Sequence, residues 1–145
     1  MTTQVPIKGL RGAVILHRCL VAGLVTMAGV IAVLAFKGIA PLLGPDGTAS
    51  LISRIMAGVS VCEMAVALLI FRPRMPVFER RYAQETYWDS PGALKAAQMV
   101  WFFLDGAAIT SLVAFLLSGE SVTAVVAAVA IVAMLVSGPD RLARS

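Results

Sequence analysis

The stretch LISRIMAGVSVCEMAVALLIF, residues 51–71, is apolar and long enough to cross a bilayer, yet it carries a glutamate at position 63. A second stretch, AAQMVWFFLDGAAITSLVAFLL, residues 96–117, repeats this pattern with an aspartate at position 105. About 20 apolar residues are enough for one membrane-spanning helix. An ionisable group inside such a helix is costly, so it indicates either function or specific helix pairing. Glu63 and Asp105 are therefore the first candidate site residues.

Apolar blocks of this length recur along the 145 residues. Apolar residues make up 59% of the chain and the mean hydropathy is +0.90, whereas soluble domains have roughly 45–50% apolar residues. The blocks are continuous rather than alternating, which favours helices over a transmembrane barrel. The sequence predicts an all-α integral membrane protein with one domain over residues 1–145. Its four transmembrane helices, arranged as two antiparallel hairpins, cover about 13–36, 50–71, 92–117 and 121–137.

The basic residues indicate how the helices are oriented. Ten of the twelve lysines and arginines lie near the two termini or near the connection between the second and third blocks. The two outer connections hold Lys37, with Arg54 just inside the second block. By the positive-inside rule, both termini and the central connection face the cytoplasm. The predicted location is the inner or plasma membrane, and the net charge of +4 indicates membrane orientation rather than nucleic-acid binding.

The connections add local predictions. Residues 76–88 contain Phe78, Tyr82, Tyr87 and Trp88, which is typical of a short helix on the membrane surface with aromatic side chains at headgroup level. Such a helix serves either as a simple anchor, which we favour, or as an element that senses lipid or binds a partner. Ser118-Gly119-Glu120 is so short that the last two blocks should form a tight hairpin.

The two carboxylates are predicted to lie at the same depth. Glu63 is eight residues before the end of its block, and Asp105 is eight residues after Ala97, where its block enters the hydrocarbon. A helix rises 1.5 Å per residue, so both lie about 12 Å above the cytoplasmic boundary. If they meet, they cannot easily both ionise and would share one proton, as in a proton relay, or bind a cation. The alternative is that each carboxyl hydrogen-bonds a neighbouring helix and fixes the assembly.

Three further residues belong to this candidate site by helical spacing. Ser60 shares a face with Glu63, because the two are three residues apart. Gln98 and Trp101 share the Asp105 face, at spacings of seven and four residues. Gln98 and Asp105 would then form a polar track leading in from the cytoplasm.

His17 and Arg18 open the first block on the cytoplasmic side. Arg18 is expected to extend its guanidinium to the headgroups, as basic residues near helix ends commonly do. In the alternative, functional hypothesis, His17 or Arg18 points inward toward the carboxylates, where a histidine could control a proton path. Arg54 lies too far from Glu63 for a direct bond and is expected to extend to the headgroups or contact Asp46 or Glu120.

No catalytic motif is present in the sequence, so we expect no enzyme, no cofactor and no metal centre. Small residues at four-residue spacing, such as Gly58 and Cys62, favour close contacts between helices. A four-span bundle encloses little volume, so we expect a homo-oligomer or other membrane subunits as partners. The leading functional prediction is an accessory or assembly subunit of a membrane complex. The alternative is a small proton- or cation-coupled transporter or channel that uses Glu63 and Asp105.

Overall fold

A computed structural model describes residues 9–44, 47–76 and 87–142, and every regular element in these ranges is helical. The main helices are α1 (Gly9–Phe36), α2 (Gly47–Ala65), α4 (Pro91–Ser118) and α5 (Ser121–Val136). A short helix, α6 (Pro139–Leu142), follows α5. Three of these helical segments are long and apolar enough to cross a membrane, and α5 is a shorter apolar helix of 16 residues. The prediction of a helical, multi-pass membrane protein is confirmed at this level.

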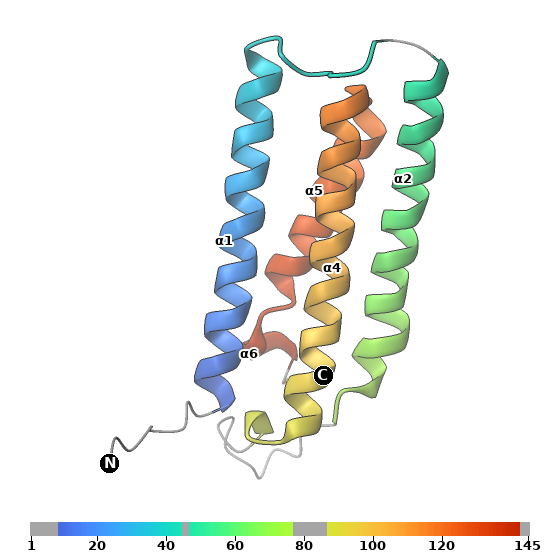
Figure 1. Ribbon diagram of the computed structural model, residues 1–145. Helices are drawn as coiled ribbons and strands as arrows, with labels where there is room; N and C mark the ends of the chain where they lie inside the picture. Colours follow the sequence, from blue (N-terminus) through green and yellow to red (C-terminus); the bar gives the residue numbers. More distant parts are fainter. Residues whose placement is uncertain (1–8, 45–46, 77–86, 143–145) are drawn as a thin grey trace, which may run out of the picture.

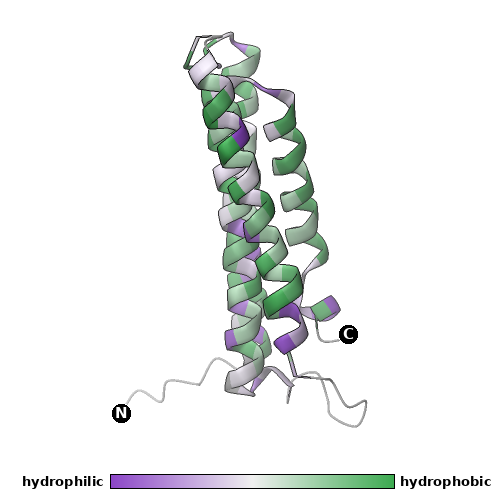
Figure 2. Cartoon of the chain, turned by 90° about the vertical axis from the view of Figure 1, so that its right-hand side faces the viewer, coloured by the Kyte–Doolittle hydropathy of each residue, from purple (hydrophilic) through white to green (hydrophobic). Residues whose placement is uncertain are grey.

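The four main helices stand side by side and alternate in direction along the chain (Figure 1). α4 packs on α1, α2 and α5, whereas α1 and α2 make few direct contacts with each other. The first predicted hairpin is therefore not a packed pair, because α4 lies between its two helices (Figure 1). Hydrophobic positions run along the helices, and hydrophilic positions are frequent at the lower end, near the end of α2 and α6 (Figure 2).

α4 is central because one of its faces is built mainly from small side chains. Helices that carry small residues can approach closely and gain packing contacts, which replace the hydrophobic effect inside a bilayer. Five of the six valines of α5 are exposed on the bundle surface instead. The small residues fully buried on α4 are Ala93, Ala97, Ala107, Ala108, Ser111 and Ala114, and those on α5 are Thr123, Ala127 and Ala130.

α2 changes geometry shortly after Glu63. Residues Val66–Phe71 form a π-helical turn, followed by a 3₁₀ turn over Arg72–Arg74. The Arg72 N–H donates to the Ala67 carbonyl, five residues back. Pro73 has no N–H to continue the ladder, so the helix ends here. π-helical turns are rare and frequently lie at functional sites. The turn that follows Glu63 therefore supports Glu63 as a candidate functional residue.

The outer connections close one end of the bundle. The N–H groups of Leu42 and Leu43 donate to the Leu116 and Leu117 carbonyls, at 3.1 and 2.9 Å. These carbonyls belong to the last turn of α4 and have no partner within the helix. Gly119 ends α4 with a φ of +68°, a left-handed conformation that glycine adopts without strain. The outer loop therefore caps α4 as well as connecting α1 to α2.

Aromatic side chains close the opposite end. Trp88 and Trp101 are buried and stack with ring centroids 6.1 Å apart, and Tyr87 meets Trp88 edge-on. Tyr87 and Trp88 therefore pack their rings on the bundle rather than extending from its surface, and their predicted depth at headgroup level stays a prediction. The rest of the predicted interfacial helix, including Phe78 and Tyr82, lies outside the described residues.

Candidate functional site

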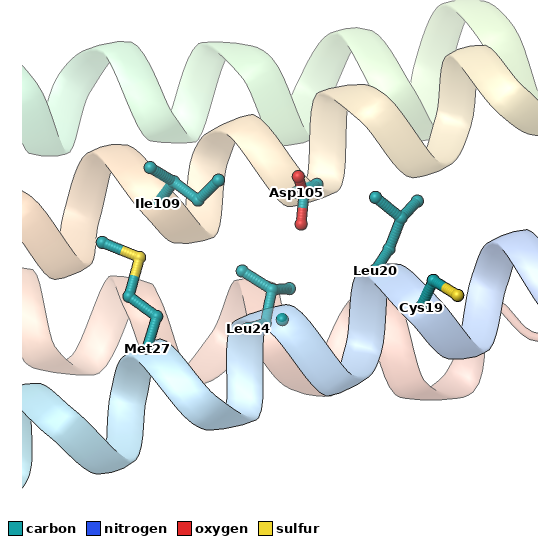
Figure 3. A pocket seen from close by; sticks show the side chains of 7 residues that line it. Cys19, Leu20, Leu24, Met27, Asp105 and Ile109 are labelled. Carbon is teal, nitrogen blue, oxygen red and sulfur yellow. The ribbon is translucent and has the colours of Figure 1, made fainter.

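Asp105 lies on α4 and faces a groove between α4 and α1. Figure 3 shows its carboxylate pointing away from α2 toward α1. The groove has a volume of about 260 Å³ and is lined by one carboxylate and otherwise by apolar and small side chains. These side chains are Cys19, Leu20, Gly23, Leu24, Met27 and Ile109. Among the described residues, no side chain forms an ion pair or hydrogen bond with Asp105.

Glu63 belongs to α2, and its side chain contacts α4 on the side opposite the Asp105 groove. Its carboxyl group lies over Gly106, where a Cβ atom built on the glycine would be 3.4 Å from Oε1. Glu63 is therefore level with Asp105 along α4, but the two side chains come from different helices and point to different neighbours. Oε2 of Glu63 is buried without a hydrogen-bond partner in the described part of the chain. The carboxyl thus holds an unused acceptor inside the apolar region.

The remaining predicted partners do not gather around the carboxylates. Ser60 is buried, and its hydroxyl donates to the Met56 carbonyl of its own helix at 3.0 Å. Gln98 is half-buried on α4, and Arg18 is exposed on α1. Trp101, which was predicted to share this face, is fully buried, and no hydrogen bond joins Gln98 to Asp105 in the described part of the chain, so the polar track stays a prediction.

His17 does turn inward, but toward α5 rather than toward a carboxylate. Its Nε2 lies 2.9 Å from the Met134 carbonyl, which requires the tautomer with a proton on Nε2. Its ring lies 5.3 Å from the Trp101 ring. Trp101 in turn donates its indole N–H to the Ser137 carbonyl at 2.7 Å. Both side chains therefore donate to carbonyls at the end of α5, where the Met134 carbonyl also accepts from the Ser137 N–H at 3.2 Å.

A separate polar cluster lies where α4 ends and α2 and α5 begin. Ser53 donates its hydroxyl to Glu120 Oε2 at 2.8 Å. Hydrogen bonds from Ser50 and Ser53 hold the pKa of the Glu120 carboxyl below its ordinary value, and the positive charge of Arg54 acts in the same direction. Arg54 and Glu120 face one open cavity of about 540 Å³. Of the two predicted contacts of Arg54, Glu120 is therefore nearby, and Asp46 lies outside the described residues.

Several site residues were not predicted from the sequence. Gly106 follows Asp105 directly, so a glycine next to an intramembrane acid was an available signal for a close approach by another side chain. Cys19 and Gly23 line the Asp105 groove, and no sequence pattern distinguishes them from other small residues. Cys19 and Cys62 are exposed, unpaired thiols on the bundle surface, so the predicted small-residue contact through Cys62 is not made within this bundle.

The arrangement provides two separate intramembrane carboxyl sites rather than one shared site. Within the described ranges, no group of three or more histidine, cysteine, aspartate or glutamate side chains is placed to hold a metal ion. Comparisons of the chain with protein families, with curated proteins and with solved structures find no match. The functional argument therefore depends on the geometry alone.

Proposed function

We propose that this small polytopic membrane protein is an accessory or assembly subunit of a membrane complex. The observation that supports this role is the direction of Asp105, which faces a lateral groove rather than Glu63. In this proposal, the groove between α1 and α4 receives a transmembrane helix of another subunit. That helix carries a hydrogen-bond donor or a cation at the depth of Asp105.

The energetic argument is that a bare carboxylate should not face lipid. A charged side chain at the centre of a membrane helix costs about 2.5–3.5 kcal/mol on insertion scales. Intramembrane ionisable groups accordingly pair with one another or with backbone groups. Because no described residue of this chain supplies that partner for Asp105, a neighbouring subunit is the simplest source of one.

The shape of the groove supports the same role. Its α1 wall includes Cys19 and Gly23, whose small side chains allow another helix backbone to approach closely. Its volume of about 260 Å³ accommodates a few side chains rather than a soluble substrate with a water shell. The groove therefore fits an interdigitating helix better than a transported solute.

The proposed orientation places both termini in the cytoplasm and the chain in the inner or plasma membrane. It is supported by the basic residues gathered at one end of the bundle, where α1 and α4 begin and α2 and α5 end (Figures 1 and 2). Positive charge near helix ends marks the cytoplasmic side. The described residues that contribute are Arg11, Arg72, Arg74, Lys95 and Arg141.

The two native thiols provide a direct experiment. Cys19 lines the Asp105 groove, whereas Cys62 is exposed on α2 beside Glu63. Each single-cysteine protein would be labelled in its native membrane with a thiol-linked photoreactive group and irradiated, and the products identified by mass spectrometry. We expect Cys19, but not Cys62, to become joined to an unlike membrane protein.

Two substitutions of Asp105 test whether its carboxylate is needed for the crosslinked product. Asp105→Asn keeps hydrogen-bonding atoms and should retain the Cys19 product, whereas Asp105→Leu removes them and should abolish it. A Cys19 product that contains only lipid or a second copy of this chain contradicts the role in a mixed complex. Equal labelling from Cys62 would mean that α1–α4 is not the specific contact.

A proton- or cation-coupled transporter is the second candidate, and Glu63 is the reason to retain it. Its Oε2 is buried without a partner, and a π-helical turn begins three residues later. A site that gains and loses a proton or cation needs an unused acceptor of this kind. The test is proton flux in liposomes, with Glu63→Gln abolishing flux in a protein that still inserts. Unchanged flux in Glu63→Gln, or no flux in the unmodified protein, removes this candidate.

A further inference from the structure

A second groove lies at the end of the bundle where α2 and α5 both finish. It has a volume of about 140 Å³. Leu68 from the π-helical turn and Ala133 and Val136 from α5 form apolar walls, and Arg72 and Arg141 lie at the same groove. Figure 2 shows this end of α2 close to α6, with hydrophilic positions on both. The groove shares no lining residue with the Asp105 groove.

The two arginines have no acidic partner among the residues that the structure describes. Both are exposed, and neither has a carboxylate partner within 4 Å among the described residues. The nearest acid in the sequence, Asp140, precedes Arg141 but does not line the groove. By contrast, Arg74 lies over the ring of Phe71, 5.9 Å from its centroid, and stays outside the groove. Two guanidinium groups therefore line one largely apolar cleft, and no residue in the described ranges supplies an anion that neutralises them.

We propose that this groove binds one anionic phospholipid. A guanidinium presents a planar set of N–H donors that matches phosphate oxygens, so Arg72 and Arg141 would hold the headgroup phosphate between them. One acyl chain would lie along Leu68, Ala133 and Val136. Basic pockets between helices at a membrane boundary recognise anionic headgroups in this way. The proposal does not depend on the docking role of Asp105.

The apolar walls identify a lipid rather than free phosphate as the ligand. A soluble phosphate would use only the two arginines, and the cleft beside them would stay uncovered. Val136 is 45% exposed, so the wall proposed to bind the acyl chain is open to the surface of the bundle. A lipid buries this wall and neutralises both arginines at the same time.

The experiment measures lipid binding to the purified full-length chain by native mass spectrometry. Phosphatidylglycerol would be titrated against phosphatidylcholine, which has the same chains but no net charge. Each basic residue near an anionic surface contributes about fivefold in affinity, so Arg72→Gln with Arg141→Gln should weaken phosphatidylglycerol binding about 25-fold. Arg74→Gln with Lys95→Gln removes the same charge at the same end and should weaken it less than about twofold.

Val136→Trp tests the acyl-chain wall without changing any charge, and we expect it to lower phosphatidylglycerol binding about tenfold by filling the cleft. It also keeps the test decisive if the double arginine variant does not fold. Equal affinity for the two lipids, or equal losses in both double variants, overturns the proposal. So does displacement of the lipid by glycerol phosphate or by an acidic peptide, since either would identify a soluble anion as the ligand.

Discussion

Replacing Trp101 with phenylalanine tests how the end of the bundle where α5 finishes is held together. Trp101 is fully buried, donates to the Ser137 carbonyl at 2.7 Å, and contacts the rings of Trp88 and His17. Phenylalanine keeps an aromatic ring but has no N–H. The interhelical hydrogen bond contributes about 1 kcal/mol inside a membrane protein. The cavity left by the smaller ring costs about 1 kcal/mol more, so we expect Trp101→Phe to lower the free energy of unfolding by about 2 kcal/mol.

The measurement is reversible unfolding in mixed micelles with increasing dodecyl sulfate, followed by far-ultraviolet circular dichroism. Phe102→Leu is the matched control, because Phe102 is the next residue along α4 but is 55% exposed on the lipid-facing surface. It should change stability by less than about 0.5 kcal/mol. A loss below about 0.5 kcal/mol for Trp101→Phe, or an equal loss for Phe102→Leu, refutes the view that this hydrogen bond and its aromatic contacts hold the end of α5.

Three further changes test other contacts. Gly9→Ala would place a methyl group against the Trp88 carbonyl, a backbone atom that cannot turn aside, and should destabilise the start of α1 by more than about 1 kcal/mol in the same unfolding assay. Gly106→Leu should displace the carboxyl of Glu63, whereas Gly106→Ala places its methyl at ordinary contact distance and should be tolerated. The displacement is measured as a change in the reactivity of the Glu63 carboxyl toward a carbodiimide. Glu120→Gln should destabilise the protein at neutral pH only. Because hydrogen bonding lowers the folded-state pKa of Glu120, the carboxylate contributes stability above the ordinary glutamate pKa and loses it as pH falls through the folded pKa. Melting curves of the unmodified protein and this variant should therefore converge in acid, and a constant difference at every pH would contradict the assignment.

The helices themselves could be predicted from the sequence because each is a continuous apolar run. The structure begins α4 at Pro91 and ends it before Gly119, where proline and glycine punctuate the sequence. Glycine at position 119 adopts the left-handed conformation that a helix end requires. These signals are local, so they need no knowledge of neighbouring helices.

The arrangement of the helices could not be predicted in the same way. Every helix of this chain carries small residues, so small-residue spacing does not identify which helix packs on which, and α4 rather than α2 became the neighbour of α1. Depth along a helix follows from counting residues, which places Glu63 and Asp105 at one level. The direction in which each carboxylate points depends on the rotation of its helix about its own axis. That rotation is set by packing over the whole bundle.

Residues with two physical roles were the hardest to interpret. His17 could serve proton transfer or hydrogen bonding, and its contact with the Met134 carbonyl is set by where α5 ends. Trp88 resembles a membrane-surface anchor in sequence, yet its ring stacks on Trp101 inside the bundle. In both cases the partner lies outside the local stretch of sequence, so a local pattern cannot reveal it.

Native mass spectrometry of the tagged chain, extracted gently from its own membrane, tests the central proposal most directly. The proposed docking of a partner helix at Asp105 predicts that an unlike membrane subunit remains bound to the unmodified protein and to Asp105→Asn. The same subunit should be absent from Asp105→Leu preparations in which the chain is still inserted and helical. A chain that leaves the membrane only as a monomer or a homo-oligomer, whatever residue occupies position 105, would contradict the proposed role.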